Sequence, residues 1–333
     1  MSMLKDKKII VVGATGKVGR EMFLVLQELG LPSNAIFAAA SCRSAGKMLT
    51  YLDKQIEVYD LEYIDFSKYD IALFSAGSEI SKTFAPKAVQ QGCIVIDNTS
   101  YFRMHEDVPL IVPEINFNDL KKYKNPNIIA NPNCSTIQMV LALKPLHDAF
   151  GLKEVIVSTY QSVSGAGQKG IEELMDQTEQ CLNNDNIEPV HFKKQIAFNI
   201  IPQIDDFTDS LYTKEELKMM NETRKILDLE HLDITATCVR VPVMIGHSIS
   251  IFLCFETKVD IKIANKELNR FKGIELIEGM EYVTPIEIPG KNQVFISRVR
   301  KHPTLPNALS LWCVADNLRK GAALNAVQIA NEL

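Results

Sequence analysis

The residues with the clearest chemistry in this chain are a cysteine and the polar segments that come after it. Cys134 lies in the run Asn131-Pro132-Asn133-Cys134-Ser135-Thr136, immediately before an apolar stretch. A glycine-rich loop comes next at 161–167, and His247 comes later, directly after Gly246. The chain also opens with a glycine turn at 13–19, of the kind that binds a dinucleotide. A thiol, a distant histidine and a dinucleotide turn are the parts needed to reduce or oxidise an acyl group through a thioester.

Cys134 is the predicted nucleophile because its neighbours are polar and turn-forming. Asn133 could act as the N-cap of the next helix, which would place Cys134 at the positive helix end, where thiolates are favoured. The alternative is a small buried hydrophobic residue, the usual state of a free cysteine. We assign that alternative to the cysteines in apolar, strand-like runs, which are Cys93, Cys238, Cys254 and Cys313.

His247 is the preferred acid/base among the histidines. It precedes a predicted strand, where a side chain can enter a cleft. His147 lies in the helix after Cys134 and is expected to pack there. The others lie among charged or turn residues and are expected on the surface; they are His105, His191, His231 and His302.

The glycine turn has the spacing G-x-x-G-x-x-G, between an apolar run at 8–12 and an amphipathic helix at 18–29. Glycine permits the turn and the close approach of backbone to a pyrophosphate, and the helix N-terminus then faces the negative charge. The alternative is a plain strand-to-helix turn. We assign cofactor contacts here to Gly13, Thr15, Gly16, Lys17 and Val18.

The loop at 41–47 bears on the choice of cofactor. An NAD enzyme tends to place an acidic residue after the second strand, and this loop has none. Its hydroxyls and cations suit a 2′-phosphate, so Ser41, Arg43 and Ser44 predict NADP. The alternative is a solvated basic loop.

Two sheet patterns succeed one another along the chain. Strands at 8–12, 35–40, 71–74 and 94–96 alternate with helices at 18–29 and 78–91, which predicts a parallel, doubly wound, Rossmann-like sheet. After about residue 132 the strands alternate apolar and polar residues, which predicts an α+β domain with a mixed sheet. Its strands are expected at 155–159, 235–241, 248–255, 294–299 and 309–314, and its helices at 171–182, 214–227 and 261–271. A last helix is expected at 321–333.

Composition excludes several classes of function. The 333 residues carry a net charge of -5, which gives no electrostatic reason to expect nucleic acid. Seven cysteines without a CxxC pair suit a reducing cytoplasm, and no apolar stretch is long enough to predict a membrane span. The N-terminus has no apolar region of a signal peptide, and we expect no metal.

These segments together resemble the aspartate-β-semialdehyde dehydrogenase family, in its shorter branch, over essentially the whole chain. The matching segments are 13–16, 41–47, 131–136, 161–167, 222–225, 240–243 with 246–247, and 321–325. The resemblance implies a dinucleotide-binding domain over 1–131 with 320–333, and a catalytic and dimerisation domain over 132–319. It implies a homodimer, with a tetramer as the alternative, and small-molecule substrates as partners.

The family reduces L-aspartyl-4-phosphate with NADPH to the semialdehyde and releases phosphate, a step toward lysine, threonine, methionine and diaminopimelate. By resemblance, Cys134 forms a thioacyl intermediate, His247 handles the proton of the hemithioacetal, and Gln161 orients the acyl group. Cofactor contacts are also implied for Ser164, Gly165 and Asn325.

Substrate contacts are implied for five residues. Arg240 would hold the α-carboxylate, and Glu222 the α-ammonium. Lys225 and Arg103, helped by Asn133, would bind phosphate. From spacing alone, Glu222 and Lys225 would instead be an exposed helical ion pair, and Arg240 a salt bridge at a strand end.

Three other classes fit these residues less well. N-acetyl-γ-glutamyl-phosphate reductase shares the thioester chemistry, but its cysteine lies in a glycine-rich run. A glyceraldehyde-3-phosphate dehydrogenase would carry a Ser-Cys-Thr-Thr-Asn-like run, which is absent. A non-catalytic NADP-binding paralogue would have lost the cysteine or histidine, and both are present. The segment at 187–209 is interpreted only as a loop with a role in dimer contact.

Overall fold

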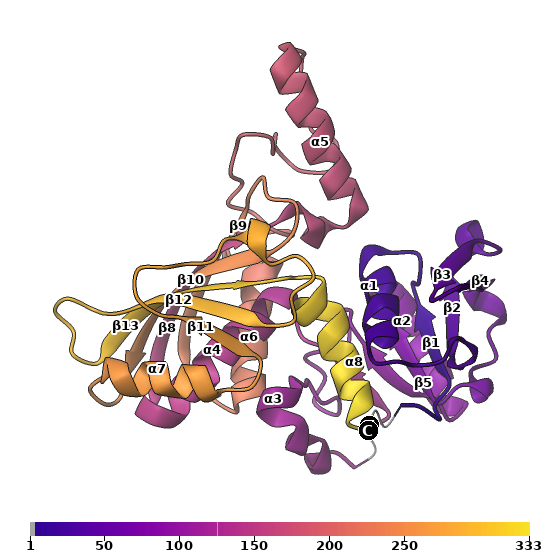
Figure 1. Ribbon diagram of the computed structural model, residues 1–333, viewed down its shortest axis with the longest axis horizontal. Coiled ribbons are helices and arrows are strands. Elements are labelled where there is room, and N and C mark those ends of the chain that lie inside the picture. The colour runs from indigo at the N-terminus through magenta and orange to yellow at the C-terminus, as the bar shows by residue number, and fades with distance from the viewer. Residues whose placement is uncertain (1–3, 125) are drawn as a thin grey trace. The chain divides into compact units, whose positions relative to one another are not determined.

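A seven-stranded sheet organises the first of two units in this computed structural model, which describes residues 4–124 and 126–333 (Figure 1). This unit, unit 1, runs as far as Asn133 and takes in Ala322–Leu333, whereas unit 2 is Cys134–Gly321. The strand order in unit 1 is β3-β4-β2-β1-β5-β6-β7. The strands are β1 (Ile9–Val12), β2 (Ile36–Ala40), β3 (Met48–Tyr51), β4 (Lys54–Asp60), β5 (Ile71–Phe74), β6 (Ile94–Asp97) and β7 (Ile128–Ala130).

All pairings in this sheet are parallel except β3 with β4. The central strands β1 and β5 are buried along their whole length, as expected for a parallel sheet covered on both faces. The Rossmann-like prediction is therefore confirmed. The hairpin of β3 and β4 and the short strand β7 were not predicted, because exposed polar residues interrupt their apolar pattern or because the strand is very short.

The helices of unit 1 are α1 (Lys17–Glu28), α2 (Ser78–Gln90), α3 (Pro113–Asn116) and α8 (Leu324–Asn331). The single helix expected at 321–333 is instead a π-helical turn, Arg319–Ala323, continued by α8. Ala326 and Ile329 of α8 lie in the same hydrophobic core as Ile9 and Val11 of β1. The last residues of the chain thus complete the core around its first strand.

Unit 2 contains a six-stranded mixed sheet in the order β11-β12-β13-β10-β8-β9, and the predicted mixed sheet is confirmed. Its strands are β8 (Leu152–Gln161), β9 (Asp233–Arg240), β10 (His247–Phe255), β11 (Ile274–Ile277), β12 (Val294–Lys301) and β13 (Ala308–Ala315). The pairs β8 with β9 and β11 with β12 are parallel, and the others are antiparallel. The four-residue strand β11 was not predicted.

Helices α4 (Cys134–Phe150), α6 (Lys214–Leu227) and α7 (Ile261–Arg270) pack on the sheet of unit 2, while α5 (Gln168–Asn183) extends away from it (Figure 1). Helix α4 is buried on nearly all sides from Ser135 to Leu146. A helix that is apolar all round belongs in the interior of a domain, so the residue at its N-terminus has a fixed position.

The cysteines largely match expectation. Cys93, Cys238 and Cys313 are buried, and burial raises the pKa of the Cys93 thiol to about 12. Cys254 was wrongly expected to be buried; it is half-buried because it alternates with inward-facing residues along β10.

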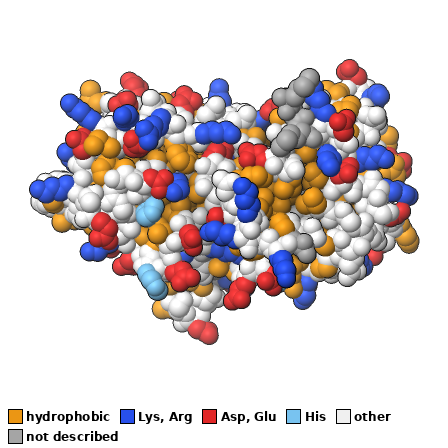
Figure 2. All heavy atoms as spheres, turned by 90° about the horizontal axis from the view of Figure 1, so that it is seen from below, with side chains coloured by type: hydrophobic (Ala, Val, Ile, Leu, Met, Phe, Trp, Pro, Cys, Tyr) orange, Lys and Arg blue, Asp and Glu red, His pale blue; other side chains and the backbone are white. Residues whose placement is uncertain are grey.

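No helix within residues 4–124 and 126–333 is long and apolar enough to cross a membrane, and no group of metal-ligating side chains gathers in those ranges. On the face drawn in Figure 2, acidic and basic side chains are interspersed.

Candidate active site

The glycine turn of unit 1 has the geometry of a close backbone approach. Gly13 comes directly after β1 with a φ of +88°, and a Cβ there would lie 2.8 Å from the backbone of Ser75, which comes after β5. A Cβ on Gly19 would lie 2.3 Å from the carbonyl oxygen of Gly13. Only glycine fits either position. The turn therefore lies at the carboxyl ends of two neighbouring parallel strands, where open α/β sheets bind their ligands.

The start of α1 suits an anion. Gly16 precedes Lys17 and provides no side-chain cap for the first N–H groups of the helix. Val18 is partly buried against the hydrophobic core, which holds the first turn of the helix in place. Uncapped N–H groups at a helix N-terminus are the usual partners of a pyrophosphate.

The loop after β2 contacts the glycine turn. Thr15 Oγ1 donates a hydrogen bond to Ser44 Oγ at 3.4 Å, and Lys47 Nζ donates to the same oxygen at 3.5 Å. Ser41 and Arg43 are exposed. Strands β1 and β2 pair in parallel, so their carboxyl ends bring hydroxyls and cations together beside the turn.

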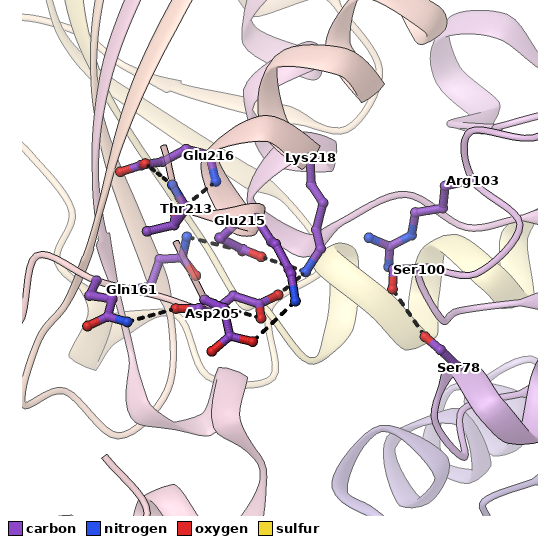
Figure 3. Close-up of polar contacts among 12 residues, drawn as sticks. Ser78, Ser100, Arg103, Gln161, Asp205, Thr213, Glu215, Glu216 and Lys218 are labelled. Atoms are coloured by element: carbon purple, nitrogen blue, oxygen red, sulfur yellow. Dashed lines mark hydrogen bonds and ion pairs between the residues drawn. The ribbon is translucent and has the colours of Figure 1, made fainter. Parts of the chain in front are cut away.

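Arg103 is held rigidly within unit 1. It is 7% exposed, and its Nε donates to the carbonyl oxygen of Asn131 while its Nη2 donates to that of Asn98, both at 3.0 Å. Asn325 Nδ2 donates to Asn131 Oδ1 at 2.7 Å and to the carbonyl oxygen of Ile111 at 3.0 Å. Asn131 thus links Arg103 to Asn325. Figure 3 draws Arg103 near the bonded hydroxyls of Ser78 and Ser100.

Cys134 is the first residue of α4, directly after Asn133, where the sequence predicted a helix start. Its side chain is partly exposed. A Cβ on Gly321 would lie 2.9 Å from Cys134 Cβ, so the backbone at 321 passes against the thiol-bearing carbon. This glycine was within a segment that the sequence singled out, but its contact with Cys134 was not anticipated.

His247 is the first residue of β10 and is completely buried. Its Nδ1 accepts a hydrogen bond from the backbone N–H of Ser162 at 3.1 Å and lies 3.1 Å from Ser162 Oγ. Because an amide N–H can only donate, the neutral ring carries its proton on Nε2. Among the described residues Nε2 has no hydrogen-bond partner. Burial, with repulsion from Arg240, lowers the pKa of His247 to about 3.

Arg240 ends β9 and lies beside His247. Its Nη1 donates to the carbonyl oxygen of Ser162 at 2.7 Å. Burial lowers the pKa of Arg240, and the negative charges of Glu215 and Cys134 oppose that shift. A Cβ on Gly165 would lie 2.8 Å from Arg240 Nη1 and 3.3 Å from His247 Nε2. Glycine at 165 therefore lets the loop pass close over both groups.

Asn317 is a contributor that the sequence did not reveal. Its Oδ1 accepts hydrogen bonds from Ser162 Oγ at 3.2 Å, Ser164 Oγ at 3.1 Å and the N–H of Gly246 at 2.9 Å. It ties the glycine-rich loop to the residue before His247. The hydroxyl of Ser164, assigned to the cofactor from the sequence, is engaged in this network. A lone asparagine after a strand gives no sequence signal for such a role.

Helix α6 presents four charged residues at spacings of three and four, which places them on one face; they are Glu215, Lys218, Glu222 and Lys225. Sequence reasoning found only the last two. Gln161 Nε2 donates to Glu215 Oε1 at 3.4 Å and to Thr159 Oγ1 at 3.3 Å (Figure 3). Glu222 is 1% exposed, so the pair is not the exposed one that spacing alone suggests. Burial lowers the pKa of Lys225, and Glu222 opposes this.

Two residues of the segment at 187–209 contact Arg240. The ring of Phe192 lies 6.0 Å from Arg240 Cζ, and Ile201 exchanges two backbone hydrogen bonds with Arg240 at 2.8 and 2.9 Å. Glu173 of α5 accepts hydrogen bonds from the N–H groups of Val190 at 3.0 Å and Phe192 at 3.2 Å. The segment therefore contacts Arg240, which the sequence did not indicate.

Two family models match the chain. The model of the semialdehyde dehydrogenase NAD binding domain matches residues 8–123, and that of the semialdehyde dehydrogenase dimerisation domain matches residues 143–320. Fold, nucleotide turn and thiol site together define an oxidoreductase of the semialdehyde dehydrogenase class, with a nicotinamide nucleotide as cofactor.

Curated relatives and solved structures narrow this class. The chain is 47% identical to an aspartate-semialdehyde dehydrogenase of Rickettsia bellii over 99% of this chain and 98% of that protein. It is 49% identical to one of Aquifex aeolicus over 98% and 97%. The crystal structure of aspartate semialdehyde dehydrogenase II from Vibrio cholerae superposes with a TM-score of 0.95 at 48% identity, covering 97% of both chains. The chain belongs to the aspartate-semialdehyde dehydrogenase family.

Proposed function

We propose that the protein reduces L-aspartyl-4-phosphate with NADPH to L-aspartate-4-semialdehyde and inorganic phosphate. A structure of the Vibrio cholerae enzyme is complexed with ASA, which supports the semialdehyde as a ligand of this chain. The observation that carries the proposal is the cluster in unit 2. There Ser162 joins a neutral His247 to a buried Arg240, and Cys134 begins a helix within electrostatic reach of that arginine.

The covalent steps are those of acyl transfer to a thiol. The thiolate of Cys134 attacks the acyl phosphate, the carbon–oxygen bond to phosphate breaks, and a thioester forms. NADPH, when bound, supplies the hydride that reduces the thioester carbon. His247 Nε2–H donates to the oxygen on which negative charge develops, and the proton of the hemithioacetal is handled there. Collapse of the hemithioacetal releases the aldehyde and restores the thiolate.

The substrate-binding groups divide by charge. Arg240 takes the α-carboxylate, because a guanidinium fork fits a carboxylate. Glu222 takes the α-ammonium, and Gln161 orients the acyl group. The cations Arg103 and Lys225, with Asn133, take the phosphate.

The preference for NADP rests on the loop after β2. Its hydroxyl at Ser44 lies beside Thr15 of the glycine turn, and Arg43 is exposed next to it. An acid that would bind the ribose hydroxyls of NAD is absent from 41–47. Ser164, Gly165 and Asn325 remain assigned to the cofactor, with Asn325 near its nicotinamide.

We also propose that two copies of the chain pair through unit 2. Ile156 and Tyr160 on the sheet face opposite α4 are 42% and 38% exposed, and Tyr160 lies 5.4 Å from the ring of Trp312. A hollow of about 350 Å³ on the same face is lined by Tyr160, Trp312 and Leu311, among others. Contiguous exposed apolar side chains are typical of an interface. Sedimentation of the wild type and of Ile156→Glu tests this, with a tetramer as the other outcome.

The function is tested by the reverse reaction on purified protein. NADP reduction with L-aspartate-4-semialdehyde should require inorganic phosphate or arsenate. N-acetylglutamate semialdehyde is the comparison substrate, because it retains the aldehyde and α-carboxylate but has an acetylated nitrogen and one more methylene. Turnover of the acetylated substrate alone would favour an N-acetyl-γ-glutamyl-phosphate reductase, and binding of NADP without turnover of either would favour a non-catalytic paralogue.

A further inference from the structure

Phe192 is an aromatic residue beside the guanidinium of Arg240, and neither the sequence motifs nor the proposed reaction uses it. The centroid of its ring is 6.0 Å from Arg240 Cζ, within the range over which a cation is attracted to the face of an aromatic ring. Arg240 is 7% exposed, and such an attraction is stronger where water is excluded. The ring is therefore placed to influence how the guanidinium lies.

The other contacts of Arg240 leave the plane of its guanidinium undetermined. Its backbone exchanges two hydrogen bonds with Ile201, at 2.8 and 2.9 Å. Its Nη1 donates to the carbonyl oxygen of Ser162 at 2.7 Å. A single hydrogen bond allows the group to turn about the donor–acceptor line, so one orientation requires a second contact. Phe192 provides a contact on the guanidinium carbon itself.

The structure leaves room for this ring on helix α5. A Cβ on Gly170 would lie 3.1 Å from Phe192 Cζ and 2.7 Å from the carbonyl oxygen of Val163, so a side chain at 170 would push against the ring and the backbone. The ring also packs against a buried apolar cluster that includes Leu174 and Ile201. Phe192 therefore occupies a place in unit 2 that fits an aromatic side chain.

Helix α5 also holds the backbone that carries the ring (Figure 1). The buried carboxylate of Glu173 accepts hydrogen bonds from the N–H groups of Val190 at 3.0 Å and Phe192 at 3.2 Å. One turn later, the buried Gln177 accepts from the N–H of Ile196 at 2.8 Å, and its Nε2 donates to Glu173 Oε1 at 2.8 Å. The backbone on both sides of the ring is thus attached to one helix.

We infer that Phe192 is a positioning residue for substrate binding: its ring restricts the Arg240 guanidinium to the plane that receives the α-carboxylate. Glu173 and Gln177 act one step further away, because they hold the backbone of the segment that carries Phe192. This inference rests on the proposed function, since it assumes that the ligand carries the α-carboxylate of aspartate semialdehyde.

Phe198 supplies a matched control. It is the same residue type in the same segment, six positions after Phe192, and it is 72% exposed. An exposed ring makes few contacts within its own unit, so its replacement by leucine should leave the guanidinium where it is. The same substitution at 192 and at 198 therefore separates a specific contact from a general effect on the segment.

The test is steady-state kinetics of Phe192→Leu and Phe198→Leu in the phosphate-dependent direction. Phe192→Leu should raise the KM for L-aspartate-4-semialdehyde roughly three- to thirtyfold, the scale of a contact between a cation and a ring face, while kcat and the KM values for phosphate and NADP change less than about twofold. Phe198→Leu should leave all of these values unchanged. Loss of folded protein would lower kcat instead, so a change confined to one KM distinguishes positioning from stability.

Glu173→Gln provides a second variant if Phe192→Leu does not fold. The amide keeps the size of the side chain but has one acceptor oxygen where the carboxylate has two, so it weakens the hold on the backbone of Phe192. It should shift the same KM in the same direction by less. An unchanged or lowered KM in Phe192→Leu would overturn the inference, as would an unchanged KM in Glu173→Gln if that variant alone can be measured.

A double-mutant cycle with Arg240→Lys decides whether Phe192 acts through Arg240. A lysine has no guanidinium plane to orient, so the loss in the double variant should be smaller than the product of the single losses. Independent, multiplicative losses would contradict the inference. An inactive wild type would instead contradict the proposed function, so the two failures are distinguishable.

Discussion

The Nδ1 atom of His247 accepts the backbone N–H of Ser162 at 3.1 Å, and this bond determines the protonation form in which the ring meets substrate. A backbone N–H cannot accept, so Nδ1 stays unprotonated and Nε2 carries the proton. The carbonyl oxygen of the same Ser162 accepts a hydrogen bond from the Arg240 guanidinium. One residue therefore determines the tautomer of the histidine and the position of the arginine.

The first prediction concerns this tautomer. Nitrogen-15 spectra of labelled protein should show His247 as the neutral Nε2–H form throughout pH 5 to 8, because burial lowers its pKa to about 3. His247→Asn identifies the resonance by its disappearance. A His247 signal that titrates near the ordinary value of about 6.5 would contradict the burial argument.

A corollary of the first prediction, from the same pKa shift, is how the free energy of unfolding depends on pH. The folded-state pKa lies below the unfolded one, so the unfolded chain binds the extra proton as pH falls below about 6.5. The contribution of His247 is present above that pH and is lost toward about pH 3. Between pH 6.5 and 5, the free energy of unfolding, measured in urea, should fall by roughly 2 kcal/mol more for the wild type than for His247→Asn. Equal losses would assign the acid sensitivity to other groups.

A second prediction concerns the nucleophile. Cys134→Ser should abolish turnover and leave NADP binding nearly unchanged, because a serine hydroxyl keeps the shape of the thiol without its thiolate. Titration of NADP by fluorescence and a standard assay measure the two effects. Cys181→Ser, at a partly exposed thiol on α5, is the control and should stay active. Near-normal turnover of Cys134→Ser would rule out the thioester route.

A third prediction tests recognition of the 2′-phosphate. Arg43→Ala should weaken the binding of NADP roughly tenfold or more. It should leave the binding of NAD about unchanged, since NAD has no phosphate at that position. Both cofactors are titrated against the wild type and against Lys54→Ala, which removes an exposed cation on β4. Parallel losses for the two cofactors would mean that Arg43 shapes the loop and does not select the phosphate.

A fourth prediction concerns the α-carboxylate. Arg240→Lys keeps the charge but loses the planar fork. It should lower kcat/KM for the semialdehyde, which corresponds to a loss of about 1.5–3 kcal/mol of transition-state stabilisation. Arg224→Lys is the control, because Arg224 bonds the carbonyl oxygen of Leu232 within the fold and should affect mainly stability. Unaltered kinetics in Arg240→Lys would assign that residue to structure.

Features encoded in a local pattern of residues were predictable from the sequence. Periodicity revealed the parallel strands, and turn chemistry placed Cys134 at a helix start. Relations between distant residues escaped prediction, since nothing local encodes them. Asn317 bonds Ser162 across 155 positions, and Phe192, whose backbone N–H donates to Glu173, contacts Arg240.

The charged residues of α6 show the same difference between local pattern, which was predictable, and tertiary contact, which was not. The spacing of Glu222 and Lys225 was visible, but an exposed ion pair was the interpretation that spacing favoured. The burial of Glu222 depends on how α6 packs against α4 and β9, which is tertiary information. Glu215 was not predicted to be near the site, because its hydrogen-bond partner Gln161 lies 54 positions away in the sequence.

The contribution of α8 to the core of unit 1 bears on the order in which the chain acquires structure during synthesis. Ala326 and Ile329 pack with Ile9 and Val11, so a nascent chain emerging from the ribosome has its first strands long before the residues that cover them. Unit 2, by contrast, is one uninterrupted stretch from Cys134 to Gly321 and contains all its own strands. Synthesis therefore delivers the first strands of the nucleotide-binding unit more than 300 positions before the apolar side chains of α8, and folding of this unit must join two segments that the whole of unit 2 separates in the sequence.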